Sequence, residues 1–201
     1  YLLANTTLAR VQIAGLLGTL LYESGGALNP AQVQFGCDVP PGPCGVGIAQ
    51  WTDPGSRFSG LVALANSKHV AWRTLDVQLQ YVWQELTHTS SFGLTALKAC
   101  TSGRCATRVV ETKYERPANQ STNCSDPNAS YCRRLADANE IFAVYGTPKS
   151  GYWMLGADGK VYAFGDASSS GSAAACAAAI AARTDGRGYW VVDRAGKVSH
   201  F

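Results

Sequence analysis

The sequence predicts an α+β protein, with a mainly helical part over residues 1–147 and a small β-rich part over residues 148–201. Up to Tyr145, apolar residues recur mostly at the spacing of amphipathic helices. After Gly146-Thr147-Pro148 the pattern changes to short strand-turn-strand units. Hydrophobic residues make up 46% of the chain and charged residues 15%, which is typical of a folded protein.

The first expected helix begins at a cap formed by Asn5 or Thr6 and runs to about Glu23. Gly25-Gly26 ends it, because glycine readily takes the left-handed backbone after a helix. One buried face is expected, made of Val11, Ala14, Leu16 or Leu17, and Leu21. Glu23 then lies on the last turn beside apolar neighbours. Partial removal from water raises the pKa of a carboxyl group, as a general acid requires.

Residues 45–52 predict a strand or hairpin, with glycines that allow close backbone approach. Further helices are expected where apolar residues again recur at helical spacing, and Pro117 should end the fourth of them. They cover residues 57–67, 74–87, 94–100, 104–116 and 133–145.

Seven cysteines are the sharpest compositional feature. Six of them form three close pairs around turn-like segments: Cys37 and Cys44, Cys100 and Cys105, Cys124 and Cys132. Three local disulfides are the simplest interpretation, and they imply an oxidising, extracytoplasmic setting and a secreted protein. A zinc site is the alternative, but no CxxC pair or nearby histidine supports it. Cys176 is left over.

The C-terminal part contains an internal repeat at an offset of 37 residues. Gly151–Leu155 recurs as Gly188–Val192, and Phe164 matches Phe201. The second copy stops where the first continues, so we expect the chain to be cut inside an array. Residues 168–182 are rich in small side chains, which predicts a flexible connector or a loosely packed helix.

Composition excludes several classes of function. A net charge of +3 fits an anionic polymer but is too weak to indicate nucleic acid. The longest smooth apolar run, residues 13–21, is too short to span a membrane. Three scattered histidines give no metal site, and no serine hydrolase motif is present. We expect no cofactor and a monomer.

Glu23 is the candidate general acid for cleavage of a glycosidic bond. A hydrolase also needs a second carboxylate, for which Asp53, Glu115 and Glu85 are candidates. A lytic transglycosylase can act without one, because a hydroxyl group of the sugar itself attacks.

Three motifs in order resemble the phage-tail lysozyme family over about residues 5–145. They are Glu23-Ser24-Gly25 with Asn29-Pro30, then Gly47-Ile48-Ala49-Gln50-Trp51-Thr52 with Arg57, and Tyr114-Glu115-Arg116-Pro117. The resemblance implies a lysozyme-like fold, bacterial cell-wall polysaccharide as substrate, Glu23 as catalytic acid, and substrate binding by Gly47, Gln50, Trp51 and Tyr114. The later repeats resemble those of secreted actinobacterial wall proteins.

Two other functions stay open. A cysteine peptidase or amidase of peptidoglycan would use Cys44 as nucleophile and His69 or His88 as base. A non-catalytic glycan-binding protein would keep the fold without its chemistry.

Overall fold

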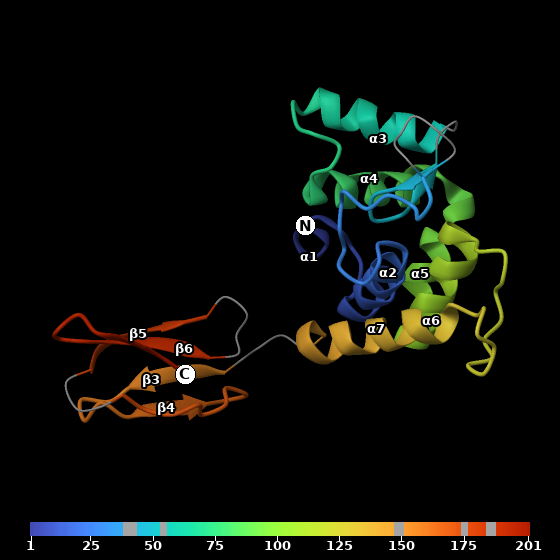
Figure 1. The fold of residues 1–201 in the computed structure, drawn as a ribbon. Helices are drawn as coiled ribbons and strands as arrows, with labels where there is room; N and C mark the ends of the chain where they lie inside the picture. The colour runs from blue at the N-terminus through green and yellow to red at the C-terminus, as the bar shows by residue number, and fades with distance from the viewer. Residues whose placement is uncertain (38–43, 53–55, 147–150, 174–176, 184–187) are drawn as a thin grey trace. The chain divides into compact units, whose positions relative to one another are not determined.

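A computed structural model describes residues 1–37, 44–52, 56–146, 151–173, 177–183 and 188–201. The chain divides into two compact units, Tyr1–Thr147 and Pro148–Phe201 (Figure 1). The first is mainly helical and the second consists of antiparallel strands. The predicted α+β class is therefore confirmed.

Apart from α1 and the turn η1, which the sequence pattern does not predict, and the later start of α2, the described helices of the first unit match the expected ones within two residues at each end. They are α1 (Leu2–Asn5), α2 (Arg10–Glu23), α3 (Ser56–Ser67), α4 (Leu75–His88), the 3₁₀ turn η1 (Ser90–Phe92), α5 (Leu94–Ala99), α6 (Gly103–Val109), the π-helix η2 (Val110–Glu115) and α7 (Tyr131–Tyr145). The segment expected as one helix over 104–116 thus changes from α to π geometry at Val110.

Helix α2 differs from the prediction in its start and in its burial. The short helix α1 precedes it, and α2 begins after Ala9, whose N–H donates to Gln12 Oε1 at 2.8 Å. Residues 12–16 and 18–20 are all buried, so a single buried face is wrong. The reason is that α2 packs against α6 and α7 as the central helix of the unit. A helix covered on several sides has no single apolar stripe.

Two glycines let α2 approach its neighbours closely. A Cβ atom on Gly15 would lie 2.7 Å from the Thr107 nitrogen in α6. One on Gly18 would lie 2.5 Å from the Ala138 nitrogen in α7. Both distances are shorter than the 3.0 Å below which Cβ atoms essentially never approach another heavy atom. Helix α7 can therefore lie this close to α2 only because residue 18 has no side chain.

The predicted hairpin is present as β1 (Gly45–Val46) and β2 (Trp51–Thr52), paired antiparallel. Gln78 of α4 holds its turn: Gln78 Oε1 accepts the Ile48 N–H at 2.9 Å, and Gln78 Nε2 donates to the carbonyls of Pro30 and Trp72. Gly47 has a φ of +73° and would place a Cβ 2.7 Å from Gln78 Oε1. This position therefore requires glycine.

All three predicted disulfides form, with Cα–Cα distances of 5.4–5.8 Å. Cys176 lies outside the described residues. Within the described part of the chain, no helix is long and apolar enough to cross a membrane. The same residues contain no group of three or more side chains suited to hold a metal ion.

The second unit contains a two-stranded and a three-stranded antiparallel sheet. The first joins β3 (Tyr152–Leu155) and β4 (Val161–Phe164), and the second has the order β5 (Ala177–Ala182), β6 (Tyr189–Asp193), β7 (Val198–His200). The end of the segment expected as a connector or loose helix is therefore strand β5. The reason is that β5 pairs with β6, which satisfies its backbone, while Ile180 packs in the core of this unit.

Replacing Gly18 by alanine should destabilise the protein by about 1–3 kcal/mol, because the new methyl group meets the backbone of α7. Helix propensity alone would favour alanine. Thermal unfolding measures the effect. Gly103→Ala is the control, since its Cβ would meet only the end of the Asn139 side chain, at 3.3 Å. Equal melting temperatures for the two variants would contradict the close approach of α2 and α7.

Candidate active site

Glu23 is the last residue of α2, and the chain turns away immediately after it. The buried Ser24 hydroxyl donates to the Leu20 carbonyl at 2.8 Å, which holds the helix end. Gly25 and Gly26 have φ values of +73° and +86° and make the turn. The Glu23 side chain is 19% exposed. Its carboxyl group therefore lies at the surface of the unit but is largely shielded from water.

Glu23 lies between two polar cavities. The larger, of about 720 Å³, is lined by Tyr22, Glu23, Gly25, Gly26, Gln34, Gly45, Gln50, Thr52, Arg133 and Asp137. The smaller, of about 420 Å³, is lined by Glu23, Ala49, Gln50, Thr52, Ser56, Arg57, Glu115 and Pro117. Glu23, Gln50 and Thr52 line both. We call the two cavities the larger and the smaller lobe of the Glu23 cleft.

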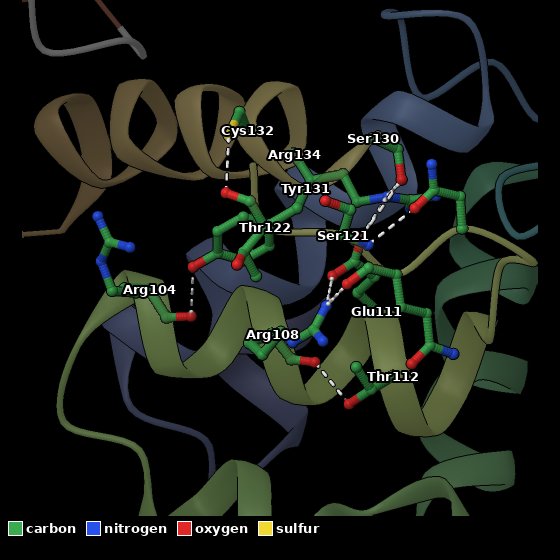
Figure 2. Close-up of polar contacts among 12 residues, drawn as sticks. Arg104, Arg108, Glu111, Thr112, Ser121, Thr122, Ser130, Tyr131, Cys132 and Arg134 are labelled. Carbon is green, nitrogen blue, oxygen red and sulfur yellow. Dashed lines mark hydrogen bonds and ion pairs between the residues drawn. The ribbon is translucent and has the colours of Figure 1, made fainter. Parts of the chain in front are cut away.

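The buried guanidinium group of Arg134, on α7, orients the Glu23 carboxyl group. Arg134 Nη2 contacts Glu23 Oε1, and Nη1 donates to the Thr19 carbonyl of α2 at 3.2 Å. Arg134 Nε donates to Ser130 Oγ at 2.9 Å (Figure 2). The side chain is only 1% exposed, so its rotamer is set by the protein and not by solvent.

Glu111 also lies close to Arg134 and balances its charge (Figure 2). This carboxylate is fully buried, and its Oε1 lies 4.0 Å from Arg134 Nε. Glu111 Oε2 accepts from Arg108 at 2.8 Å. A buried charge needs such partners, because its removal from water is costly. Glu111 therefore serves the structure around the cleft and does not line it.

Glu115 reaches the smaller lobe from the end of the π-helix η2. The Arg116 N–H donates to the Glu111 carbonyl at 2.7 Å, and Arg116 takes a left-handed φ of +55°, which ends the helix. A π-turn shifts the following side chains relative to an α-helix, and such turns occur often at functional sites.

The carboxyl group of Glu115 favours its protonated form. Glu115 is partly exposed as a residue, but its Oε1 is enclosed and has no hydrogen-bond partner among the described residues. Burial raises the pKa of Glu115 well above 4.5, and the negative charge of Glu23 raises it further. Arg57 and Arg134 oppose this shift without cancelling it. The smaller lobe therefore holds a carboxyl group that favours its protonated form, beside the carboxyl group of Glu23.

Glu85, another candidate for the second carboxylate, does not line the cleft, and both of its carboxylate oxygens already accept hydrogen bonds. Its Oε1 accepts from Arg57 Nε at 2.6 Å. Its Oε2 accepts from Trp51 Nε1 at 2.9 Å, from Arg57 Nη2 at 3.0 Å and from the Tyr114 hydroxyl. Burial raises the pKa of Tyr114 well above 10, so this hydroxyl stays a donor. Glu85 thus ties the hairpin, α3 and η2 together.

The structure brings Glu23, Glu115 and Gln50 together on the cleft. Trp51 and Tyr114, expected to bind substrate, are each 1% exposed and contact Glu85. Gly47 supports the hairpin turn through its contact with Gln78. Asp53 lies outside the described residues.

Sequence reasoning did not assign a role to Arg134, Arg133 or Asp137. Arg133 and Asp137 are four residues apart on α7 and line the larger lobe. Burial raises the pKa of Asp137 above its ordinary value. Only the spacing of four residues along a helix could have indicated that they share a face.

Cys44 forms a disulfide with Cys37, so its sulfur is not a free thiolate. His88 Nδ1 contacts the Gln84 carbonyl of its own helix, and neither His69 nor His88 lines the cleft. The cysteine peptidase alternative therefore lacks its nucleophile.

Glu115→Gln should stabilise the protein more strongly as the pH rises. Between pH 4.5 and the raised pKa of Glu115, the folded state keeps a proton that the unfolded state has lost. The free energy of unfolding of the wild type therefore falls with rising pH in this range. Because glutamine does not titrate, the free energy of unfolding of the variant does not fall for this reason. Melting temperatures from about pH 5 to about pH 8 test it. The exposed Glu140→Gln is the control; parallel curves for the wild type and Glu115→Gln would contradict the burial of this carboxyl group.

Comparison with known proteins gives one match to a protein family. Residues 1–145 match the family model for phage tail lysozyme. No curated protein matches the chain. The matched residues include Glu23, Glu115 and Asp137, whose carboxyl groups line the cleft, and all described helices of the first unit. Since the match spans well over half of the sequence, the chain belongs to the phage tail lysozyme family.

Proposed function

We propose that the Glu23 cleft cleaves the glycan strands of bacterial peptidoglycan, with Glu23 as the general acid. Membership of a lysozyme family implies a glycosidase that acts on peptidoglycan. The observation that carries the assignment to this site is that Glu23 and Glu115, from separate elements, line one polar cleft. Glycosidic cleavage requires a carboxylic acid beside the leaving oxygen.

The position of Glu23 between the two lobes supports its role as the acid. A glycan strand that fills both lobes passes this carboxyl group, because Glu23 lines each of them. Arg134 holds Oε1, and we assign Oε2 to the glycosidic oxygen of the substrate. Such a fixed carboxyl group is already oriented for proton transfer, which lowers the entropic part of the barrier.

Glu115 is proposed as the second carboxyl group of the site. Two carboxyl groups that interact electrostatically share one proton over a range of pH. Burial keeps this proton on Glu115 when the cleft is open to water. Glu115 therefore brings a proton to the cleft that Glu23 lines, and we propose it as the source of the proton that Glu23 passes to the glycosidic oxygen.

Gln50, Thr52 and Arg57 are the proposed contacts to the sugar, because each lines the smaller lobe with a polar side chain. Gln50 takes a φ of +46°, and its Nε2 donates to the Gly47 carbonyl at 2.9 Å, so the hairpin turn fixes its direction. Gly47, Trp51 and Tyr114 act indirectly, by holding the hairpin and Glu85 in place.

The three disulfides support action in an oxidising setting, so we propose that the protein is secreted. We also assign catalysis to residues 1–147, since the cleft lies wholly within the first unit.

Glu23→Gln should lower the rate of glycan cleavage by about 100-fold or more, because an amide cannot donate the required proton. Binding to purified wall should persist, since the amide oxygen can still accept from Arg134. The assay follows clearing of peptidoglycan together with pull-down on insoluble wall. Glu140→Gln is the matched control on the exposed side of α7. Activity equal to that of the wild type would exclude Glu23 as the acid.

Mass spectrometry of the released wall fragments should show cuts in the glycan strand, and the new ends identify the reaction. Anhydro ends indicate attack by a hydroxyl group of the sugar, and reducing ends indicate attack by water.

Residues 1–147 alone should release the same fragments. Cut peptides, or binding without any cleavage by the pure wild-type protein, would contradict the proposed function.

A further inference from the structure

The two lobes of the Glu23 cleft differ in size and in the pairing of their cations. The larger lobe has a volume of about 720 Å³ and contains Arg133, and the smaller lobe has about 420 Å³ and contains Arg57. Arg57 Nε lies 2.6 Å from Glu85 Oε1, and Arg57 Nη2 donates to Glu85 Oε2 at 3.0 Å. The positive charge in the smaller lobe is therefore matched within the protein itself.

Arg133 is exposed near the start of α7 and lacks such a carboxylate partner. Among the residues that the structure describes, no ion pair of 4.0 Å or less joins it to a carboxylate. Its Cζ lies 5.4 Å from the centroid of the Tyr22 ring, which also lines the larger lobe. A guanidinium group that lies over an aromatic ring keeps the N–H donors at its edge for other acceptors. Arg133 can therefore bind an acceptor that enters this lobe.

Glu23 and Asp137 also line the larger lobe. The charge of Glu23 is matched by the buried Arg134. Asp137 lies one helical turn after Arg133; burial raises its pKa, and the charge of Arg133 lowers it by a smaller amount. Arg133 and Asp137 thus attract each other without an ion pair between them among the described contacts. The lobe offers a cation and, beside it, a carboxylate that can accept from an N–H.

The strand that we propose as substrate alternates two sugars of different chemistry. One sugar carries hydroxyl and acetamido groups. The other also carries a lactyl ether, to which a short peptide stem is joined by an amide bond, and this stem supplies carboxylates and N–H groups. A planar guanidinium group pairs with a carboxylate through two parallel hydrogen bonds. An arginine without a carboxylate partner, in the larger of two lobes, therefore suits the substituted sugar.

We propose that the larger lobe binds the peptide-bearing sugar and that Arg133 determines this specificity by pairing with a carboxylate of the peptide stem. Asp137 then accepts from N–H groups of the same stem. The smaller lobe, whose arginine is already paired, takes the sugar without a stem on the other side of Glu23. This assignment rests on the proposed function, because it concerns the strand that Glu23 cleaves.

The kinetics of cleavage of three soluble glycan strands test the contact. The first strand keeps its peptide stems. The second is the same strand after carbodiimide coupling to methylamine has turned its carboxylates into neutral amides, and the third has lost its stems to an amidase. Arg133→Gln should lower kcat/KM about 10-fold more on the first strand than on the second, because a hydrogen bond to a charged group contributes this much. The loss should lie in KM, since the stem is held alike in the ground state and the transition state.

Arg104→Gln is the matched control, because Arg104 is an exposed arginine of α6 that lines neither lobe. It removes the same charge and should change kcat/KM equally on the stem-bearing and the amidated strands. Equal losses for Arg133→Gln on these two strands, or no loss on either, would overturn the proposal. An equal loss on the stem-bearing and the stem-free strands would overturn it as well, since the carboxylate of the stem-free strand belongs to the lactyl group.

A wild type that cleaves none of the strands would contradict the proposed function, and binding then tests the contact separately. The affinity of Glu23→Gln for the stem-bearing and the amidated strands is measured with and without Arg133→Gln. Glu23→Gln should bind the stem-bearing strand about 10-fold more tightly, and Arg133→Gln should remove this preference. Equal affinity of Glu23→Gln for the two strands would overturn the proposal. Because Arg133 is exposed, Arg133→Gln should keep the melting temperature of the wild type, which checks the fold.

Discussion

The buried guanidinium group of Arg134 is the interaction on which the first unit depends. It joins the carbonyl of Thr19 and the carboxyl group of Glu23, both on α2, to the start of α7. The contact requires that α2 and α7 lie unusually close, which Gly18 permits. A cation removed from water must be matched by negative charge, and Glu23 and Glu111 supply it. The position of the cleft carboxyl group is thus set by packing between helices.

Four glutamates near the cleft show how environment assigns roles to one residue type. Glu85 and Glu111 are buried with cationic partners at hydrogen-bond distance, and both hold elements together. Glu23 has one such contact and faces the cleft. Glu115 has an enclosed oxygen without a partner among the described residues, so it favours a proton. Of these four glutamates, Glu23 and Glu115, which line the cleft, are therefore the least completely paired.

The second unit illustrates a different constraint. Its two hairpins share register and turn geometry, yet equivalent side chains are buried in one copy and exposed in the other. Strand β5 pairs with β6 of the second hairpin, and Trp153 of the first hairpin packs against Tyr189, so this face of the second hairpin is covered.

The sequence by itself determined the fold class, the described helices other than α1 and η1, the hairpin and the three disulfides, because periodicity, turn residues and cysteine spacing are local signals. It also identified Glu23 and Glu115 as candidates. Only the tertiary structure decided the burial of α2 on several sides, the π-helix that ends at Glu115 and the pairing of Glu23 with Arg134. It also decided that Glu85 accepts hydrogen bonds from Arg57 and so is not free for substrate. Glu23 and Arg134 are 111 residues apart. Such contacts depend on how close two helices come, which no local pattern encodes.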